Sequence, residues 1–183
     1  MSEQTIRRTE RIVDLRAAMP WLVAAGIYVL VIAVAPQLLG DPDTYSHLAL
    51  GRWILDHGAV PTVDPFSANF RGTHWLAFEW LSEVVFALAY AAGSWMGMVA
   101  VASAAAATAF GLLTHFLLRE LRPTAALFGI LVALPLTAPH ILARPHILAL
   151  PLLVAWVGAL IRSVDTRTAP SWLLLPLITL WAN

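Results

Sequence analysis

Long uncharged apolar segments alternate with short charged segments along this chain of 183 residues. A helix needs about 20 apolar residues to cross the roughly 30 Å hydrocarbon core of a bilayer. The pattern predicts an all-α fold, a multi-pass integral membrane helical bundle with a long outer loop carrying interfacial helices. The predicted spans cover residues 20–39, 95–118, 124–143 and 147–161, a fifth begins at 171–183, and the outer loop covers 40–80.

One uncharged segment, Val84–Leu118, is too long for a single crossing. Its 35 residues would form a helix of about 52 Å at 1.5 Å per residue. The pair Gly93-Ser94 and the nearby Gly97 offer a natural break. We therefore expect Phe78–Ala92 to form a helix on the outer interface, followed by the second span.

The outer loop holds most of the candidate chemistry, since it contains seven of the 22 Asp, Glu and Arg residues and three of the six His. Within it, Asp43–His57 has a broad apolar side and a polar side, which predicts a short helix lying along a membrane surface and ending at Gly58. The proline-containing segment Val60–Pro65 predicts an extended loop.

Composition supports a membrane protein. Hydrophobic residues make up 60% and charged residues 12%, whereas charged residues reach about 25% in soluble domains. A net charge of zero argues against a nucleic-acid partner, and the absence of cysteine excludes disulfides and thiolate metal sites. The uncharged run Ala17–Gly40 has 24 residues, beyond the 7–15 of a signal peptide's apolar region, which favours a retained span.

Arginine placement predicts the orientation, because positive charge is enriched on the cytoplasmic side. With the N-terminus inside, eight arginines lie on the cytoplasmic side and three outside. We therefore expect a cytoplasmic N-terminus and an outer loop facing the periplasm or cell exterior. The arginine-only, alanine-rich composition is typical of a GC-rich bacterial genome, so the expected location is the bacterial inner membrane. The inside set is Arg7, Arg8, Arg11, Arg16, Arg119, Arg122, Arg162 and Arg167, and the outside set is Arg52, Arg71 and Arg144.

Two motifs carry a family resemblance: Asp41-Pro42-Asp43-Thr44-Tyr45 opening the loop helix, and Ala143-Arg144 at the outer end of the third span. With the order of spans and helices over residues 8–183, the chain resembles membrane glycosyltransferases of the GT-C class. The nearest branch is the bacterial one related to protein mannosyltransferases and the lipid A aminoarabinose transferase. Here Thr44 replaces the second acid of that family's Asp-Glu pair, and the Lys-Pro-Pro patch is absent. The family's greater number of spans implies that this chain is part of a longer enzyme.

The resemblance implies that Asp43 is the general base that takes the acceptor's proton, with Glu79 as a partner that positions the acceptor or binds a cation. The structural alternative for Asp43 is a favourable charge at the helix N-terminus, and Asp41 suits the capping position. For Glu79, the alternative is a solvated acid before the second interfacial helix.

The remaining candidates are substrate-binding residues. Arg144 and His146 are expected to hold a lipid phosphate, for which the arginine fork is suited, and a headgroup anchor is the alternative. With His47 and His74, the acids Asp41 and Asp43 form a candidate site for a divalent cation such as Mg²⁺ or Mn²⁺. Asp43 and His47 are four residues apart and so share a helical face.

The leading functional prediction is transfer of a sugar from a polyprenyl-phosphate donor to an envelope glycan or lipid acceptor at the outer face. The alternatives are a transporter subunit and a non-catalytic membrane scaffold. A transporter is expected to show ionisable groups at the bilayer midplane and repeated halves. This chain shows neither.

Overall fold

The computed structural model describes residues 3–181, which form an all-helical fold with no strand in that range beyond one isolated antiparallel bridge between Val63 and His74. The last two residues of the predicted fifth span, 182–183, lie outside the described part. The helices are α1 (Glu3–Ala33), α2 (Ala35–Leu38), α3 (Asp43–His57), α4 (Trp80–Glu120), α5 (Pro123–Thr137), the 3₁₀ turn η1 (Ala138–His140), α6 (Pro145–Asp165) and α7 (Leu174–Trp181).

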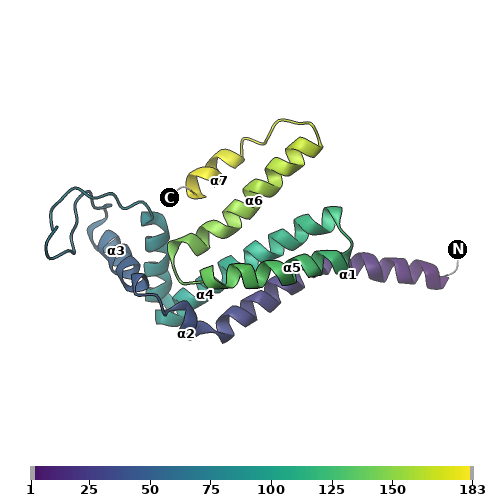
Figure 1. The fold of residues 1–183 in the computed structure, drawn as a ribbon, viewed down its shortest axis with the longest axis horizontal. Helices are drawn as coiled ribbons and strands as arrows, with labels where there is room; N and C mark the ends of the chain where they lie inside the picture. Colours follow the sequence, from purple (N-terminus) through teal and green to yellow (C-terminus); the bar gives the residue numbers. More distant parts are fainter. Residues whose placement is uncertain (1–2, 182–183) are drawn as a thin grey trace.

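Helix α4 is the centre of the bundle and packs against α1, α3, α5 and α6. Figure 1 shows α1, the second part of α4, α5 and α6 running along the long axis, while α3 and the loop after it gather at one end. Helix α7 folds back beside α6. The polar segment predicted from the sequence is therefore concentrated at a single end of the molecule.

Four helices are long and apolar enough to cross a membrane: Leu15–Ala33, Trp80–Glu120, Pro123–His140 and Pro145–Asp165. Their number agrees with the four complete predicted spans, but the bounds differ. The first span was predicted to continue to residue 39, whereas α1 ends at Ala33 and the short helix α2 follows it. Helix α6 continues four residues past the predicted end at Ile161, because charged side chains such as Arg162 are tolerated in a last turn that reaches water. The helix before it ends early, in the turn η1 around Pro139.

The predicted break in the long apolar segment is confirmed. Inside α4, Gly93 has φ −148° and ψ 19°, and Ser94 has φ 55° and ψ −146°, so two helices meet at a kink. The two parts approach closely, since a Cβ on Gly97 would lie 2.0 Å from the carbonyl oxygen of Ala89. The first part begins at Trp80, two residues after the predicted start, and runs at a steep angle to the second (Figure 1).

Small residues allow α1 to approach the second part of α4. Ala102 and Ala106 are completely buried, and a Cβ on Gly111 would lie 3.2 Å from the Cβ of Ala24. The outer faces of the same bundle remain apolar and open, with Trp21 79% exposed on α1 and Leu136 72% exposed on α5. Such surface is unusual for a soluble monomer and typical of helices that contact lipid or further helices.

Candidate functional site

Arg144 joins the start of α6 to the start of α3. Its two terminal nitrogens reach different carboxylates: Nη1 lies 3.0 Å from Oδ2 of Asp41, and Nη2 lies 2.5 Å from Oδ2 of Asp43. The other oxygen of Asp41, Oδ1, accepts the backbone N–H of Asp43 at 2.9 Å. Asp41 thus satisfies a free amide at the helix start and also pairs with the arginine.

The local sequence explains where Arg144 lies. A residue before proline is restricted to extended backbone, and Arg144 has φ −125° and ψ 159° ahead of Pro145, the first residue of α6. Its neighbour Ala143 is fully buried and donates its N–H to the carbonyl of Leu38 at 2.9 Å. That bond holds the α5–α6 connection against α2, which brings the guanidinium within reach of the two acids.

The helix α3 crosses the first part of α4 with almost no space between their backbones. A Cβ on Gly51 would lie 2.0 Å from the carbonyl oxygen of Glu83, so only glycine fits at this crossing. His47 lies one turn before Gly51 on α3, and its Nδ1 is 3.0 Å from Oε1 of Glu83 and 4.0 Å from Oε2 of Glu79. The close crossing therefore assembles a three-residue cluster from two helices.

Glu83 is buried, with 5% of its side chain exposed, while Glu79 is 47% exposed. The second carboxylate oxygen of Glu83, Oε2, is buried and has no hydrogen-bond partner among the described residues. The cluster borders a cavity of about 540 Å³. Its wall is formed by α3, the 64–79 loop and α4, including Ser46, Leu50, Phe66, Trp75 and Phe78.

The structure does not bring together the four residues predicted as a cation site, Asp41, Asp43, His47 and His74. Within the described part of the chain, the group of at least three His, Asp or Glu residues whose ligand atoms all lie within 4.8 Å of one another is His47, Glu79 and Glu83. The two aspartates bind Arg144 instead. Asp43 and His47 are one turn apart on α3, but Asp43 pairs with Arg144, just before α6, whereas His47 pairs with Glu83 on α4.

His74 and His146 are not part of either cluster. His74 is exposed in the loop, where its backbone bridges Val63. His146 is also exposed, and its Nε2 lies 2.7 Å from the carbonyl oxygen of His140. The predicted pairing of His146 with Arg144 around a phosphate is therefore not preorganised by a contact between them.

Asp64 organises the loop that covers the cavity. Its carboxylate accepts the hydroxyl and the N–H of Ser67 and the N–H of Phe66. These bonds, with that from the Ser67 hydroxyl the most important, lower the pKa of Asp64 below its ordinary value of 3.8. The adjacent backbone bonds from Asp64 to Thr73 and from Trp75 to Thr62 close the loop at its base.

Sequence reasoning did not name Glu83 as a site residue, although it lies one helical turn after Glu79, the residue that precedes α4, so that the two acids can share a face. It also did not predict an aromatic group on α3 and α4. Tyr45 and Tyr90 form T-shaped pairs with Trp95 at centroid distances of 5.2 and 5.0 Å, and Arg52 lies 4.4 Å from the ring centre of Tyr90. The group could not be predicted from spacing, because Tyr45 and Arg52 come from a different helix than Tyr90 and Trp95.

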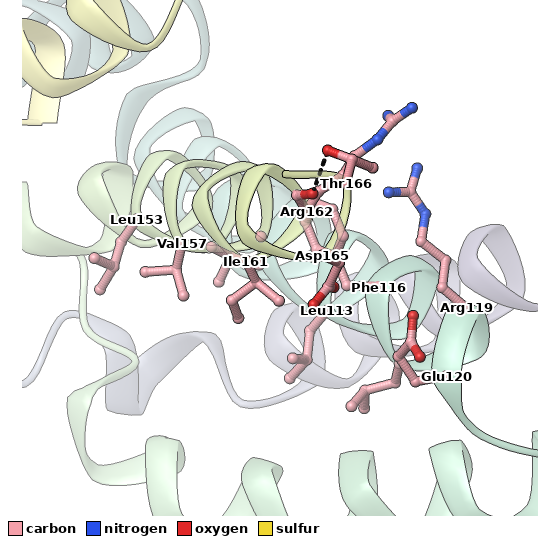
Figure 2. Close-up of a pocket in the computed structure, with 13 residues that line it drawn as sticks. Leu113, Phe116, Arg119, Glu120, Leu153, Val157, Ile161, Arg162, Asp165 and Thr166 are labelled. Atoms are coloured by element: carbon pink, nitrogen blue, oxygen red, sulfur yellow. Dashed lines mark hydrogen bonds between the residues drawn. The ribbon is translucent and has the colours of Figure 1, made fainter. Parts of the chain in front are cut away.

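A second cavity, of about 600 Å³, lies between α4 and α6 and contains none of the predicted site residues. Figure 2 shows its apolar wall, formed by side chains such as Leu153 and Val157 on the left, and charged residues that include Arg119, Glu120 and Asp165 further to the right. Those charges belong to the α4–α5 and α6–α7 ends, whereas the carboxylate clusters belong to the opposite ends of the same helices.

No protein-family model, curated protein or solved structure matches this chain. The resemblance to GT-C glycosyltransferases therefore remains a prediction from the motifs.

Proposed function

We propose that this protein is the N-terminal part of a membrane glycosyltransferase that moves a sugar from a polyprenyl-phosphate donor to a hydroxyl acceptor at the outer face. The supporting observation is the bridge that Arg144 makes between Asp41 and Asp43 at the end of the bundle. A site for such a donor needs a cation for the phosphate and a base for the acceptor at the membrane boundary. In this proposal Arg144 is the cation and Asp43 the base, and the two side chains are in direct contact.

The helices support a membrane location. Four of them have the length and composition of spans, and their open apolar faces would otherwise contact water. The arginine bias fits the same arrangement, because Arg16 donates to the carbonyls of Leu118 and Leu121 at the end of α4 that also carries Arg119. That end is the proposed cytoplasmic side, and the Arg144 bridge is on the proposed outer side.

In the proposed reaction, the acceptor oxygen forms a bond to the anomeric carbon while the bond from that carbon to the phosphate oxygen breaks. The polyprenyl phosphate leaves with the bonding electron pair, and the acceptor's proton passes to Asp43. Arg144 pairs with the phosphate through the same fork that holds the carboxylates. Donor binding would thereby draw the guanidinium from Asp43 and free the carboxylate oxygen that must take the proton.

Exposure of the three side chains fits these roles. Asp43 is 56% exposed and can meet an acceptor, whereas Asp41 is only 16% exposed and is suited to anchoring Arg144. Glu79, also partly exposed, lies at the cavity edge, where it is proposed to position the acceptor.

The test is sugar transfer by the full-length protein from a radiolabelled polyprenyl-phosphate donor, comparing Asp43→Asn with Asp41→Asn. Asparagine keeps the shape and can accept a hydrogen bond from Arg144, but it cannot take the proton. We expect Asp43→Asn to lower transfer by about 10²-fold or more. Normal transfer by Asp43→Asn with an inactive Asp41→Asn would assign the base to Asp41. Two fully active variants would remove this loop from the chemistry and favour a scaffold or transporter subunit.

A further inference from the structure

We propose that His47, Glu79 and Glu83 bind a divalent transition-metal ion, with Zn²⁺ as the ion that the donor set favours. The proposal does not rest on sugar transfer. It rests on three ligand atoms from α3 and α4 within 4.8 Å of one another, and on a buried carboxylate oxygen that has no partner.

The unpartnered oxygen is the first argument. Only 5% of the Glu83 side chain is exposed, and burying a carboxylate is costly unless its oxygens are paired. A protonated His47 would supply one positive charge and one hydrogen bond, to Oε1. Oε2 would still have no donor. A cation bound between the residues can neutralise the charge and can be reached by a carboxylate oxygen that the histidine does not satisfy.

Charge around the cluster supports the same conclusion. Among the side chains that the structure describes, no arginine forms an ion pair with Glu79 or Glu83. The nearest outer-side arginine in sequence, Arg52, lies over Tyr90, and Arg144 is held by two aspartates. The third outer-side arginine, Arg71, acts on Asp64. Within the described residues, the two glutamates of the cluster therefore have His47 and no arginine as an ion-pair partner.

The geometry is close to that of a metal site. Ligand bonds of about 2.0–2.1 Å at tetrahedral angles separate ligand atoms by about 3.3 Å. The separation from Nδ1 of His47 to Glu83 is 3.0 Å, and to Glu79 it is 4.0 Å. Only Glu79 must move appreciably, and it is the more exposed of the two acids. The 540 Å³ cavity leaves room for a water molecule or another ligand in an open position.

The donor atoms select the ion. Mg²⁺ and Ca²⁺ prefer oxygen ligands only, whereas an imidazole nitrogen suits zinc and other first-row metals. Zinc also binds more tightly than Mn²⁺ to the same site. Binding through Nδ1 requires that this nitrogen carry no proton, so neutral His47 would hold its proton on Nε2 and would give up its hydrogen bond to Glu83.

The experiment measures zinc binding to the full-length protein in detergent. The protein is purified through an affinity tag that contains no histidine, and any bound metal is removed with a chelator beforehand. Zinc is added in buffered solutions, and the bound metal is measured by mass spectrometry. We expect the wild-type protein to bind one ion per chain. The dissociation constant for zinc should be about tenfold larger or more in His47→Gln and in Glu79→Gln. The matched controls His74→Gln and Glu120→Gln lie outside the cluster and are expected to bind as the wild type does.

A spectroscopic measurement makes the result independent of folding effects. With Mn²⁺ in the site, pulsed electron paramagnetic resonance is expected to show the coupling of the metal to an imidazole nitrogen. This signal should disappear in His47→Gln and persist in Glu79→Gln. No retained zinc at micromolar concentrations, or equal affinity in cluster and control variants, would overturn the proposal. Zinc binding by a wild-type protein that transfers no sugar would count against the proposed function and leave the metal site standing.

Discussion

A Cβ on Gly51 of α3 would lie 2.0 Å from the backbone carbonyl oxygen of Glu83 on α4. This contact fixes how closely the two helices cross, and hence how near His47 comes to the buried carboxylate. A chemically inert residue therefore controls the arrangement of the ionisable ones.

Gly51→Ala is expected to push α3 away from α4. The added methyl meets backbone on a neighbouring helix, which no change of rotamer relieves, so we expect a loss of about 1–3 kcal/mol in unfolding free energy. Zinc binding should weaken in parallel. The measurement is denaturant unfolding of the full-length protein in detergent.

The control for this substitution is Gly26→Ala on α1, where nothing lies within 4 Å of the added Cβ. It is expected to unfold at or above the wild-type denaturant concentration, since alanine is the better helix former. Equal stability of Gly51→Ala and Gly26→Ala would contradict the close crossing.

The bridge between Arg144 and Asp41 is expected to appear as a coupling energy in a double-mutant cycle. The pair is partly exposed, so we expect about 0.5–1 kcal/mol between Arg144→Gln and Asp41→Asn. Unfolding midpoints of the four proteins give the value. Pairing Asp41→Asn with Arg122→Gln, at the other end of the bundle, should give additive effects, and additivity in both cycles would show that the bridge contributes nothing.

The proposed orientation can be tested with single cysteines, because the chain has none of its own. Ala68→Cys lies exposed in the long loop, beside the Ser67 whose hydrogen bonds to Asp64 should be preserved. We expect it to react with a membrane-impermeant thiol reagent in intact cells. Ala169→Cys, exposed between α6 and α7, should react only after lysis. The reverse pattern would place the N-terminus outside.

Asp64 is expected to make the loop sensitive to acid. Its folded-state pKa lies below the ordinary 3.8, so its stabilising effect is fully present above about pH 4 and is lost as the pH falls through the folded value. When the pH is lowered to 3, the protection of the amides in residues 62–75 against hydrogen exchange should fall, after correction for the pH dependence of exchange in an unprotected amide. In Asp64→Asn that loss of protection on acidification should vanish, and an unchanged loss would assign the acid sensitivity to another group.

Much of the helical framework could be predicted from the sequence. Apolar length located the four long helices, and Gly93-Ser94 located the kink, because chain length against bilayer thickness and backbone freedom are local properties. Gly58 ended α3 as predicted, in the left-handed conformation with φ 63°. The end of α6 was predicted too early because charge was treated as a stop, although a helix can continue into water.

The pairing of the candidate residues could not be predicted in the same way. Sequence spacing placed Asp43 and His47 on one face of α3. It could not show that Arg144, 101 residues away from Asp43, forms ion pairs with Asp41 and Asp43. Glu83 is likewise 36 residues from His47, and its burial depends on the crossing at Gly51.

The sequence by itself determined the all-helical architecture, the segments that are long and apolar enough to span a membrane, and the concentration of polar groups between α2 and α4. Those features follow from local hydrophobicity and backbone preference. Only the tertiary structure decided that the polar groups divide into an Arg144 bridge and a His47–Glu79–Glu83 cluster. The physical reason is that ion pairing and burial depend on distances between helices, which packing at Ala143 and Gly51 sets.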